Sequence, residues 1–193
     1  MKVISGILKG RKIDGYDIDG TRPTMDRVKE SLFAMIYDYI KDSTVLDLFA
    51  GSGNLGIEAI SNGAKQCYFI DNNKEVIKVL NKNINNLNIG SYSKILLSDW
   101  KKFLNEASEK KLKFDIIFVD PPYAYDVYEK ILDKVSTLNL LNDNGIIVLE
   151  HSNLKLKDTY NNLTLYKLKK YGNKSVNIYK TNWHIFFYVL NFS

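Results

Sequence analysis

The feature that most constrains the fold of this chain is a regular alternation of apolar runs with segments of helical periodicity. The runs have the length of buried strands, and the segments between them have the length of helices. The runs occupy residues 43–50, 65–71, 93–98, 114–120 and 145–151, and the helical segments occupy residues 54–63, 74–87, 100–110 and 125–141. Strands that are apolar on both faces and joined by helices form parallel sheets. The sequence therefore predicts an α/β fold with a mostly parallel sheet and helices on both faces.

The two ends of the chain depart from this alternation. Residues 3–13 alternate loosely around two glycines and predict a small hairpin, and a helix is expected after Pro23 and Thr24. Residues 163–170 and 175–180 flank a turn at Tyr171-Gly172-Asn173, which predicts a C-terminal hairpin. With that hairpin the expected sheet has seven strands.

Length and cysteine content restrict the class of protein. A chain of 193 residues is expected to form a single domain with a full core. The lone Cys67 excludes an internal disulfide, and with two distant histidines the sequence predicts no metal site. The first residues lack the apolar core of a signal peptide, and no run is long enough to span a bilayer. We expect a cytoplasmic protein that is not attached to a membrane.

Positive charge gathers near the N-terminus. Seven basic residues lie between positions 1 and 29, against fewer acidic ones: Lys2, Lys9, Arg11, Lys12, Arg22, Arg27 and Lys29. Such a cluster fits either a polyanion or an ordinary solvated surface. Arginine binds phosphate through two parallel hydrogen bonds, so Arg11, Arg22 and Arg27 are the predicted contacts to nucleic acid.

The stretch VLDLFAGSGNLGIEAI, residues 45–60, joins a strand to a helix through a glycine turn. Its Gly51, Gly53 and Gly56 have the spacing of a dinucleotide site, where the helix N-terminus holds a phosphate. S-adenosylmethionine presents a carboxylate and an amino group instead. Asp47, close before the turn, supplies an acceptor for that amino group. The motif therefore favours S-adenosylmethionine over a nicotinamide or flavin.

Two further acids end consecutive predicted strands. Asp71 lies about 20 residues beyond the glycine turn, where a carboxylate accepts both ribose hydroxyls. Asp99 ends the next strand and is expected to meet the adenine amino group. The ligand of an open α/β sheet binds along this carboxyl edge. The predicted cofactor site also includes the neighbouring Phe49, Asn72 and Trp100.

The motif DPPY, residues 120–123, ends the fourth predicted strand. Because neither proline has an N–H, the Asp120 carboxylate and the Pro121 carbonyl are both free to accept hydrogen bonds from a substrate amino group. Two acceptors orient a poorly nucleophilic amino nitrogen and stabilise the positive charge that it develops. Tyr123 offers an aromatic face for a base, and Pro122 fixes the backbone between them. These four residues are the predicted catalytic site.

Several stretches together resemble the bacterial RsmD family of class I methyltransferases: MKVISGILKGRKI, TRPTMDRVKESLFAMI, VLDLFAGSGNLGIEAISNGA, IIFVDPPY and YGNKSVNIY. The resemblance covers roughly residues 1–180. It implies transfer of a methyl group from S-adenosylmethionine to the N2 amino group of one guanine in 16S ribosomal RNA, within an assembling or complete small subunit. It also implies the seven-stranded Rossmann-like order, with residues 1–40 facing RNA and residues 41–180 forming the catalytic core.

Two departures from the family pattern and three rival functions remain. Asn54 replaces a small apolar residue and is expected to cap the following helix. Residues 181–193 form an unusually apolar tail that fits an extra element, an oligomer contact or an altered reading frame. The rivals are an amino methyltransferase acting on DNA adenine or protein glutamine, a nicotinamide oxidoreductase, and a non-catalytic RNA-binding module.

Overall fold

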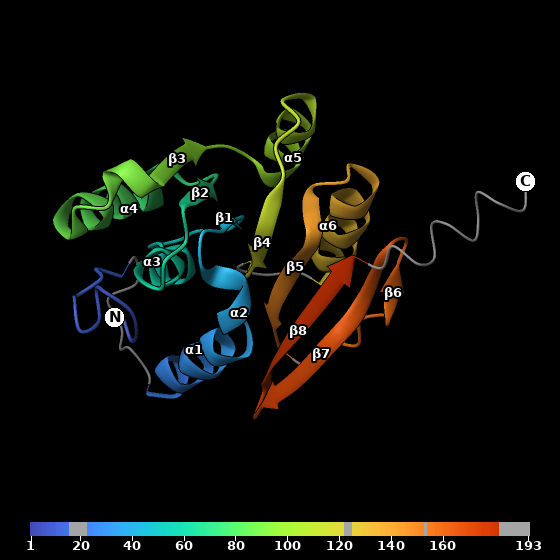
Figure 1. Ribbon diagram of the computed structural model, residues 1–193, viewed down its shortest axis with the longest axis horizontal. Coiled ribbons are helices and arrows are strands. Elements are labelled where there is room, and N and C mark those ends of the chain that lie inside the picture. Colours follow the sequence, from blue (N-terminus) through green and yellow to red (C-terminus); the bar gives the residue numbers. More distant parts are fainter. Residues whose placement is uncertain (16–22, 122–124, 153, 182–193) are drawn as a thin grey trace, which may run out of the picture.

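The computed structural model describes residues 1–15, 23–121, 125–152 and 154–181, and of residues 23–25, 125 and 126 only the backbone. Its strands form one sheet in the order β3-β2-β1-β4-β5-β8-β7-β6. The strands are β1 (Thr44–Asp47), β2 (Gln66–Asp71), β3 (Ser93–Leu97), β4 (Phe114–Val119), β5 (Leu141–His151), β6 (Thr159–Tyr160), β7 (Leu163–Tyr171) and β8 (Lys174–Thr181). Figure 1 shows the hairpin β7–β8 at the opposite end of the sheet from β3.

The prediction of a mostly parallel sheet is confirmed. Strands β1 to β5 pair in parallel, and the C-terminal strands pair antiparallel to them and to each other. The prediction of seven strands is one short, because the two-residue β6 adds an eighth strand at the edge. Strand β5 also begins at Leu141 rather than at 145, through a polar segment that pairs with the start of β4 across an irregularity.

The helices follow the predicted order. They are α1 (Pro23–Met35), α2 (Tyr37–Ile40), α3 (Asn54–Ser61), α4 (Lys74–Leu87), a 3-10 turn η1 (Gly90–Tyr92), α5 (Trp100–Glu109) and α6 (Tyr125–Thr137). Asn73 caps α4 and Asp99 caps α5, each through a side-chain oxygen that accepts backbone N–H groups of the first turn. The short α2, η1 and β6 lack the length that periodicity needs, and the sequence did not predict them.

Two hydrophobic clusters cover the two faces of the sheet. Successive residues along β1 and β4 alternate between them, so that Val45 and Ile116 join one cluster while Leu46 and Ile117 join the other. The first cluster receives α1 to α4, and the second receives α5 and α6. This arrangement confirms the expectation that the central strands are buried on both faces.

The N-terminal segment is a closed loop with one isolated bridge, between Lys2 and Lys12, instead of a regular hairpin. Its backbone closes through bonds from Val3 N to Arg11 O and from Ile13 N to Met1 O, both 2.9 Å. Val3 and Ile13 are fully buried in the cluster under α1 and α3. The segment is therefore part of the fold and packs against the helices on one face of the sheet.

A buried ion pair joins this loop to α1 and α3. Lys29 Nζ lies 3.0 Å from Glu58 Oε2, and both side chains are almost fully buried. Glu58 also accepts hydrogen bonds from the backbone N–H groups of Ile4 and Ser5, while Lys29 donates to Asn54 Oδ1. The prediction that Asn54 caps α3 is wrong: Gly53 is the N-cap in a left-handed conformation, and Asn54 is the first helical residue.

Candidate functional site at the carboxyl edge of the sheet

Acidic residues stand at the carboxyl ends of five neighbouring parallel strands. Asp47 ends β1, Asp71 ends β2, Asp99 follows β3 by two residues, Asp120 follows β4 and Glu150 is the penultimate residue of β5. Because the strands are parallel, these residues share one edge of the sheet. This is the edge at which open α/β sheets bind their ligands.

Asp47 lies at the centre of the edge and is almost completely buried. Its Oδ2 accepts the Gly56 N–H at 2.9 Å, which attaches the first turn of α3 to the end of β1. The pKa of Asp47 is raised to about 7, chiefly by desolvation and also by the nearby carboxyl groups of Asp120 and Asp71, while the hydrogen bond from the Gly56 N–H opposes the increase. An amino group from a ligand would offset this concentration of negative charge. The Asp47 carboxyl group and its acidic neighbours therefore fit the predicted role of accepting the amino group of S-adenosylmethionine.

The glycine turn divides its three glycines between two tasks. Gly51 and Gly53 adopt positive φ angles of 54° and 89°, which favour glycine and let the chain turn directly into α3. Gly56 serves packing, because a Cβ there would lie 2.3 Å from the Phe69 ring and 2.6 Å from the Cys67 sulfur. A Cβ on Gly51 would have no neighbour closer than 4.0 Å, so the backbone at Gly51 stays open to a ligand.

Asp71 is attached to the same turn. Its Oδ2 accepts the Gly51 N–H at 3.0 Å, and its Oδ1 accepts the Asn73 N–H at 2.9 Å. Each carboxylate oxygen retains a second lone pair for a ribose hydroxyl. The predicted neighbour Asn72 is exposed beside it.

At the end of β3, the Asp99 side chain caps α5 by accepting the Lys101 N–H at 2.8 Å. Trp100 and Phe49 are half-buried against the cluster that contains α5 and α6. Capping of α5 is by itself a sufficient reason for an aspartate at position 99. The contact between Asp99 and adenine therefore stays a prediction.

Asp120 is exposed directly after β4, and Pro121 beside it is buried. The pKa of Asp120 is raised, first because surrounding protein atoms exclude part of its water and second because Glu150 is anionic; Lys174 opposes both effects. Water still reaches the exposed carboxyl group and moderates the increase. Pro122 and Tyr123 lie outside the described residues, so the stacking role of Tyr123 remains a prediction.

The predicted RNA contacts have unequal support. Arg11 is exposed and donates from Nη2 to the Asn86 carbonyl of α4 at 2.7 Å, and Arg27 is exposed on α1. Arg22 lies outside the described residues. The structure thus leaves Arg27 accessible and gives Arg11 a local structural partner.

His151 and Cys67 are both buried within the fold. His151 is buried, its Nδ1 accepts the Leu154 N–H at 3.0 Å, and its Nε2 lies 2.9 Å from Asn177 Oδ1. Burial lowers the pKa of His151 and raises that of the Cys67 thiol. Within the described ranges, no group of three or more His, Cys, Asp or Glu side chains is arranged to hold a metal, and no helix is long and apolar enough to cross a membrane.

Sequence reasoning missed three residues that interact electrostatically with Asp120: Glu150, Lys174 and Tyr128. Glu150 forms an ion pair with Lys174 of β8, and Tyr128 of α6 donates its hydroxyl to the Glu150 carbonyl at 2.7 Å. The position of Glu150 at the end of the fifth apolar run was a usable signal. Lys174 gave none, because only the antiparallel return of β8 brings it to this edge.

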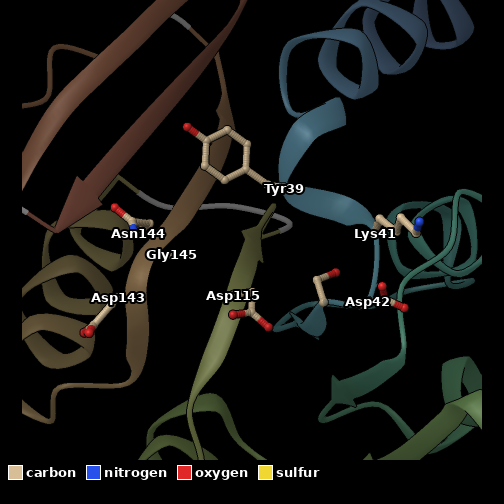
Figure 2. Close-up of a pocket in the computed structure, with 8 residues that line it drawn as sticks. Tyr39, Lys41, Asp42, Asp115, Asp143, Asn144 and Gly145 are labelled. Carbon is tan, nitrogen blue, oxygen red and sulfur yellow. The ribbon is translucent and has the colours of Figure 1, made fainter.

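A separate cavity of about 230 Å³ lies at the opposite edge, near the amino ends of β1, β4 and β5. Figure 2 shows Tyr39, Asp115 and Asp143 among the side chains around it. Asp115 is engaged in the fold, since it accepts the Thr44 N–H and the Asn142 amide at 2.7 Å each. The acids with raised pKa, Asp47 and Asp120, lie at the other edge, so this cavity is not the candidate site.

Comparisons with known proteins find relatives that are named for rRNA methylation. The chain is 35% identical over 180 residues to "Ribosomal RNA small subunit methyltransferase D" of Haemophilus influenzae, covering 93% of each chain. It is 39% identical over 145 residues to the protein of the same name in Escherichia coli K12, covering 75% of this chain and 68% of the relative.

Solved structures share the fold. One from Escherichia coli, yhhF, named as a candidate methyltransferase, superposes with a TM-score of 0.83 at 32% identity over 94% of this chain and 98% of the other. The 16S rRNA N2 G1207 methyltransferase of Thermus thermophilus superposes at 0.67 with 19% identity, over 86% of this chain and 45% of the other. Its similarity is in the fold, that of the class I S-adenosylmethionine-dependent methyltransferases.

The family described as conserved hypothetical protein 95 matches residues 1–180. That range contains every described strand of the sheet except for Thr181, the last residue of β8, and it contains every acid of the carboxyl edge. The extent of this match and the full-length relatives lead to one conclusion: the chain belongs to this family, the RsmD family of rRNA methyltransferases.

Proposed function

We propose that this protein transfers a methyl group from S-adenosylmethionine to the exocyclic N2 amino group of a guanine in 16S ribosomal RNA. The observation that carries the proposal is the position of Asp120 and Pro121 at the carboxyl edge, beside Asp47 and the glycine turn. The full-length relatives named for small-subunit rRNA methylation support the substrate class. A ribosomal substrate would place the protein in the cytoplasm.

The cofactor half of the edge is assigned to the residues around the glycine turn. Asp47 would accept the methionine amino group, and the turn at Gly51 and Gly53 with the N-terminus of α3 would hold the carboxylate. Asp71 would accept the ribose hydroxyls. The adenine end would meet Phe49, Asn72, Asp99 and Trp100. Bound there, S-adenosylmethionine supplies an electrophilic methyl group.

The substrate half is assigned to the DPPY residues. The Asp120 carboxylate and the Pro121 carbonyl would each accept one hydrogen of the guanine amino group. Both contacts direct the nitrogen lone pair away from conjugation with the ring, and an anionic Asp120 also stabilises the positive charge that develops on the nitrogen. Tyr123 would pack on the base, a contact worth about 1–3 kcal/mol. Unstacking the guanine from RNA costs a few kcal/mol, which this contact offsets in part.

The RNA partner is supported by the distribution of charge along the C-terminal hairpin, whose turn lies at this edge. The last acidic residue of the chain is Asp158, and the hairpin after it carries five lysines: Lys167, Lys169, Lys170, Lys174 and Lys180. Lys169 Nζ and the Tyr171 hydroxyl both donate to Ser31 Oγ of α1, at 2.8 and 2.7 Å. These bonds join the basic hairpin to the helix that carries Arg27, and Figure 1 shows the hairpin turn near α1. We assign phosphate contacts to Arg27 and to the exposed lysines beside the hairpin turn, Lys169 and Lys170.

The test is methyl transfer from labelled S-adenosylmethionine to several substrates in parallel, followed by nucleoside analysis. The substrates are unmethylated small subunits, free 16S RNA, transfer RNA, duplex DNA and a glutamine-containing protein. We expect N2-methylguanosine from a 16S substrate only. Label on adenine or glutamine would favour the rival amino methyltransferases, and NADH binding without methyl transfer would favour an oxidoreductase.

A further inference from the structure

The side chain next to Asp120 across the sheet is another carboxylate. Strands β4 and β5 run parallel, and their last register pair joins Val119 to Leu149. One residue further along each strand stand Asp120 and Glu150. Paired residues of parallel strands direct their side chains to the same face, so these two acids meet there. Glu150 is the largest charge effect on Asp120 and raises its pKa.

Lys174, on the antiparallel strand β8, lies beside both acids. Its Nζ forms an ion pair with Glu150 Oε1, and the pair is largely sheltered, with 33% of the lysine side chain and 13% of the glutamate side chain exposed. Tyr128 fixes the Glu150 backbone from the α6 side through its hydroxyl. Lys174 also lies close enough to Asp120 for each to favour the charged form of the other.

The other titratable groups near Asp120 are a carboxyl group, Asp47, and a neutral hydroxyl, Tyr128. Asp47 approaches from β1, and burial raises the pKa of the Tyr128 hydroxyl on α6, which keeps it neutral. Among the described side chains that interact electrostatically with Asp120, Lys174 is therefore the only cation. Without it, Glu150 and Asp47 would both disfavour an ionised Asp120.

We propose that Lys174 and Glu150 are positioning residues that act through Asp120: the lysine, paired with the glutamate, offsets the glutamate charge and favours the anionic form of Asp120. The inference rests on the proposed function, in which an anionic Asp120 accepts a hydrogen of the target amino group. A protonated carboxyl group would present a donor in place of one acceptor. Methyl transfer should then fail below the pH at which Asp120 takes up a proton.

A purely structural pair makes a different prediction. Strands β5 and β8 are already joined by six consecutive register pairs from Ile146 to His151, so the ion pair is not needed to connect them. If Lys174 and Glu150 only stabilised the sheet, their substitution would lower the melting temperature without moving the pH dependence of catalysis. The pH profile therefore separates the two roles.

The experiment measures single-turnover methyl transfer to the 16S substrate between pH 5.5 and 9, with saturating S-adenosylmethionine. Lys174→Met should move the acidic limb to higher pH by about one unit, since an opposite charge nearby shifts a carboxyl pKa by about 1–3 units when sheltered. Glu150→Gln should move the limb to lower pH. The double variant should return close to the wild-type profile. Lys78→Met, which breaks an exposed ion pair with Glu75 on α4, is the matched control and should leave the limb in place.

Asp120→Asn separates failure of the inference from failure of the proposed function. The amide still accepts a hydrogen bond but cannot be protonated, so this variant should lose the acidic limb and become insensitive to Lys174→Met. If Asp120→Asn keeps the wild-type limb, the proposed role of Asp120 is wrong. A second outcome overturns only the inference about Lys174. In that outcome Asp120→Asn removes the acidic limb, but Lys174→Met and Glu150→Gln leave it at the wild-type pH. The proposed role of Asp120 would then stand. Cofactor affinity, measured by calorimetry, confirms that each variant is folded.

Discussion

At the scale of the residue, Asp47 combines burial with negative neighbours. Its carboxyl group is almost inaccessible, and its pKa in the folded state is about 7 against a reference of 3.8. A carboxyl group whose pKa rises on folding stabilises the fold fully only below its unfolded pKa. That stability is lost as the pH increases from about 4 through about 7. Without ligand, an ionised Asp47 therefore weakens the fold at neutral and alkaline pH.

Asp47→Asn should consequently stabilise the protein at pH 8. The amide oxygen keeps the hydrogen bond from Gly56, while the buried charge is removed. The gain should approach an upper limit of roughly 4 kcal/mol at pH 8 and decrease steadily towards pH 5, where Asp47 itself takes up a proton. Urea unfolding of both proteins across this range measures the difference, and S-adenosylmethionine affinity should fall in the same variant. A difference in stability that does not change with pH would contradict this interpretation of Asp47.

At the scale of the element, the N-terminal loop and α1 are attached to α3 by buried charges. Lys29 and Glu58 lie within 3.0 Å of each other and are hidden from water, so removing one partner leaves the other charge uncompensated. Lys29→Met should therefore lower the free energy of unfolding by about 3–5 kcal/mol. Glu58→Gln in the same background should restore part of the loss.

Lys82→Met is the control for this prediction. Lys82 forms an ion pair with Asp14 at 2.9 Å on the protein surface, and its removal should leave the free energy of unfolding nearly unchanged, because solvent screens exposed ion pairs. Urea unfolding at pH 7 measures all three variants. Equal effects of Lys29→Met and Lys82→Met would mean that the buried pair contributes no more than a surface pair.

The strands and helices also show which parts of the fold can be predicted from sequence patterns. Long apolar runs located β1 to β5 within a few residues, because burial on both faces leaves a strong signal. The two-residue β6 and the four-residue α2 depend on tertiary contacts and leave none. Likewise, Asp47, Asp71 and Asp120 were predicted from their places at strand ends. Lys29–Glu58 and Glu150–Lys174 pair residues far apart in sequence, and only the packed fold brings them together.

At the scale of the whole molecule, basic residues from both ends of the chain lie near one edge of the sheet. Arg27 on α1 and Lys170 on β7 are both exposed, and the bonds to Ser31 join their elements. If both contact phosphates, Arg27→Ala and Lys170→Ala should each weaken RNA binding uniformly across sequences. Each should lower the slope of log affinity against log salt by about 0.7–0.9.

Titration of RNA affinity from low to high salt measures these slopes. Lys78→Ala on α4 serves as the control, because it removes the same charge from a different element, and its slope should equal that of the wild type. Unchanged slopes for both test variants would remove α1 and the hairpin from the RNA interface. The proposed catalytic role of Asp120 would be unaffected.

The most direct test of guanine-N2 methylation at this edge compares the wild type with Asp120→Ala on unmethylated small subunits, with calorimetric measurement of S-adenosylmethionine binding to both. We predict N2-methylguanosine from the wild type, no detectable product from the variant, and cofactor affinities that agree within about twofold. Absence of N2-methylguanosine from the wild type would contradict the proposed reaction. Equal loss of cofactor binding and turnover in Asp120→Ala would make Asp120 a structural residue.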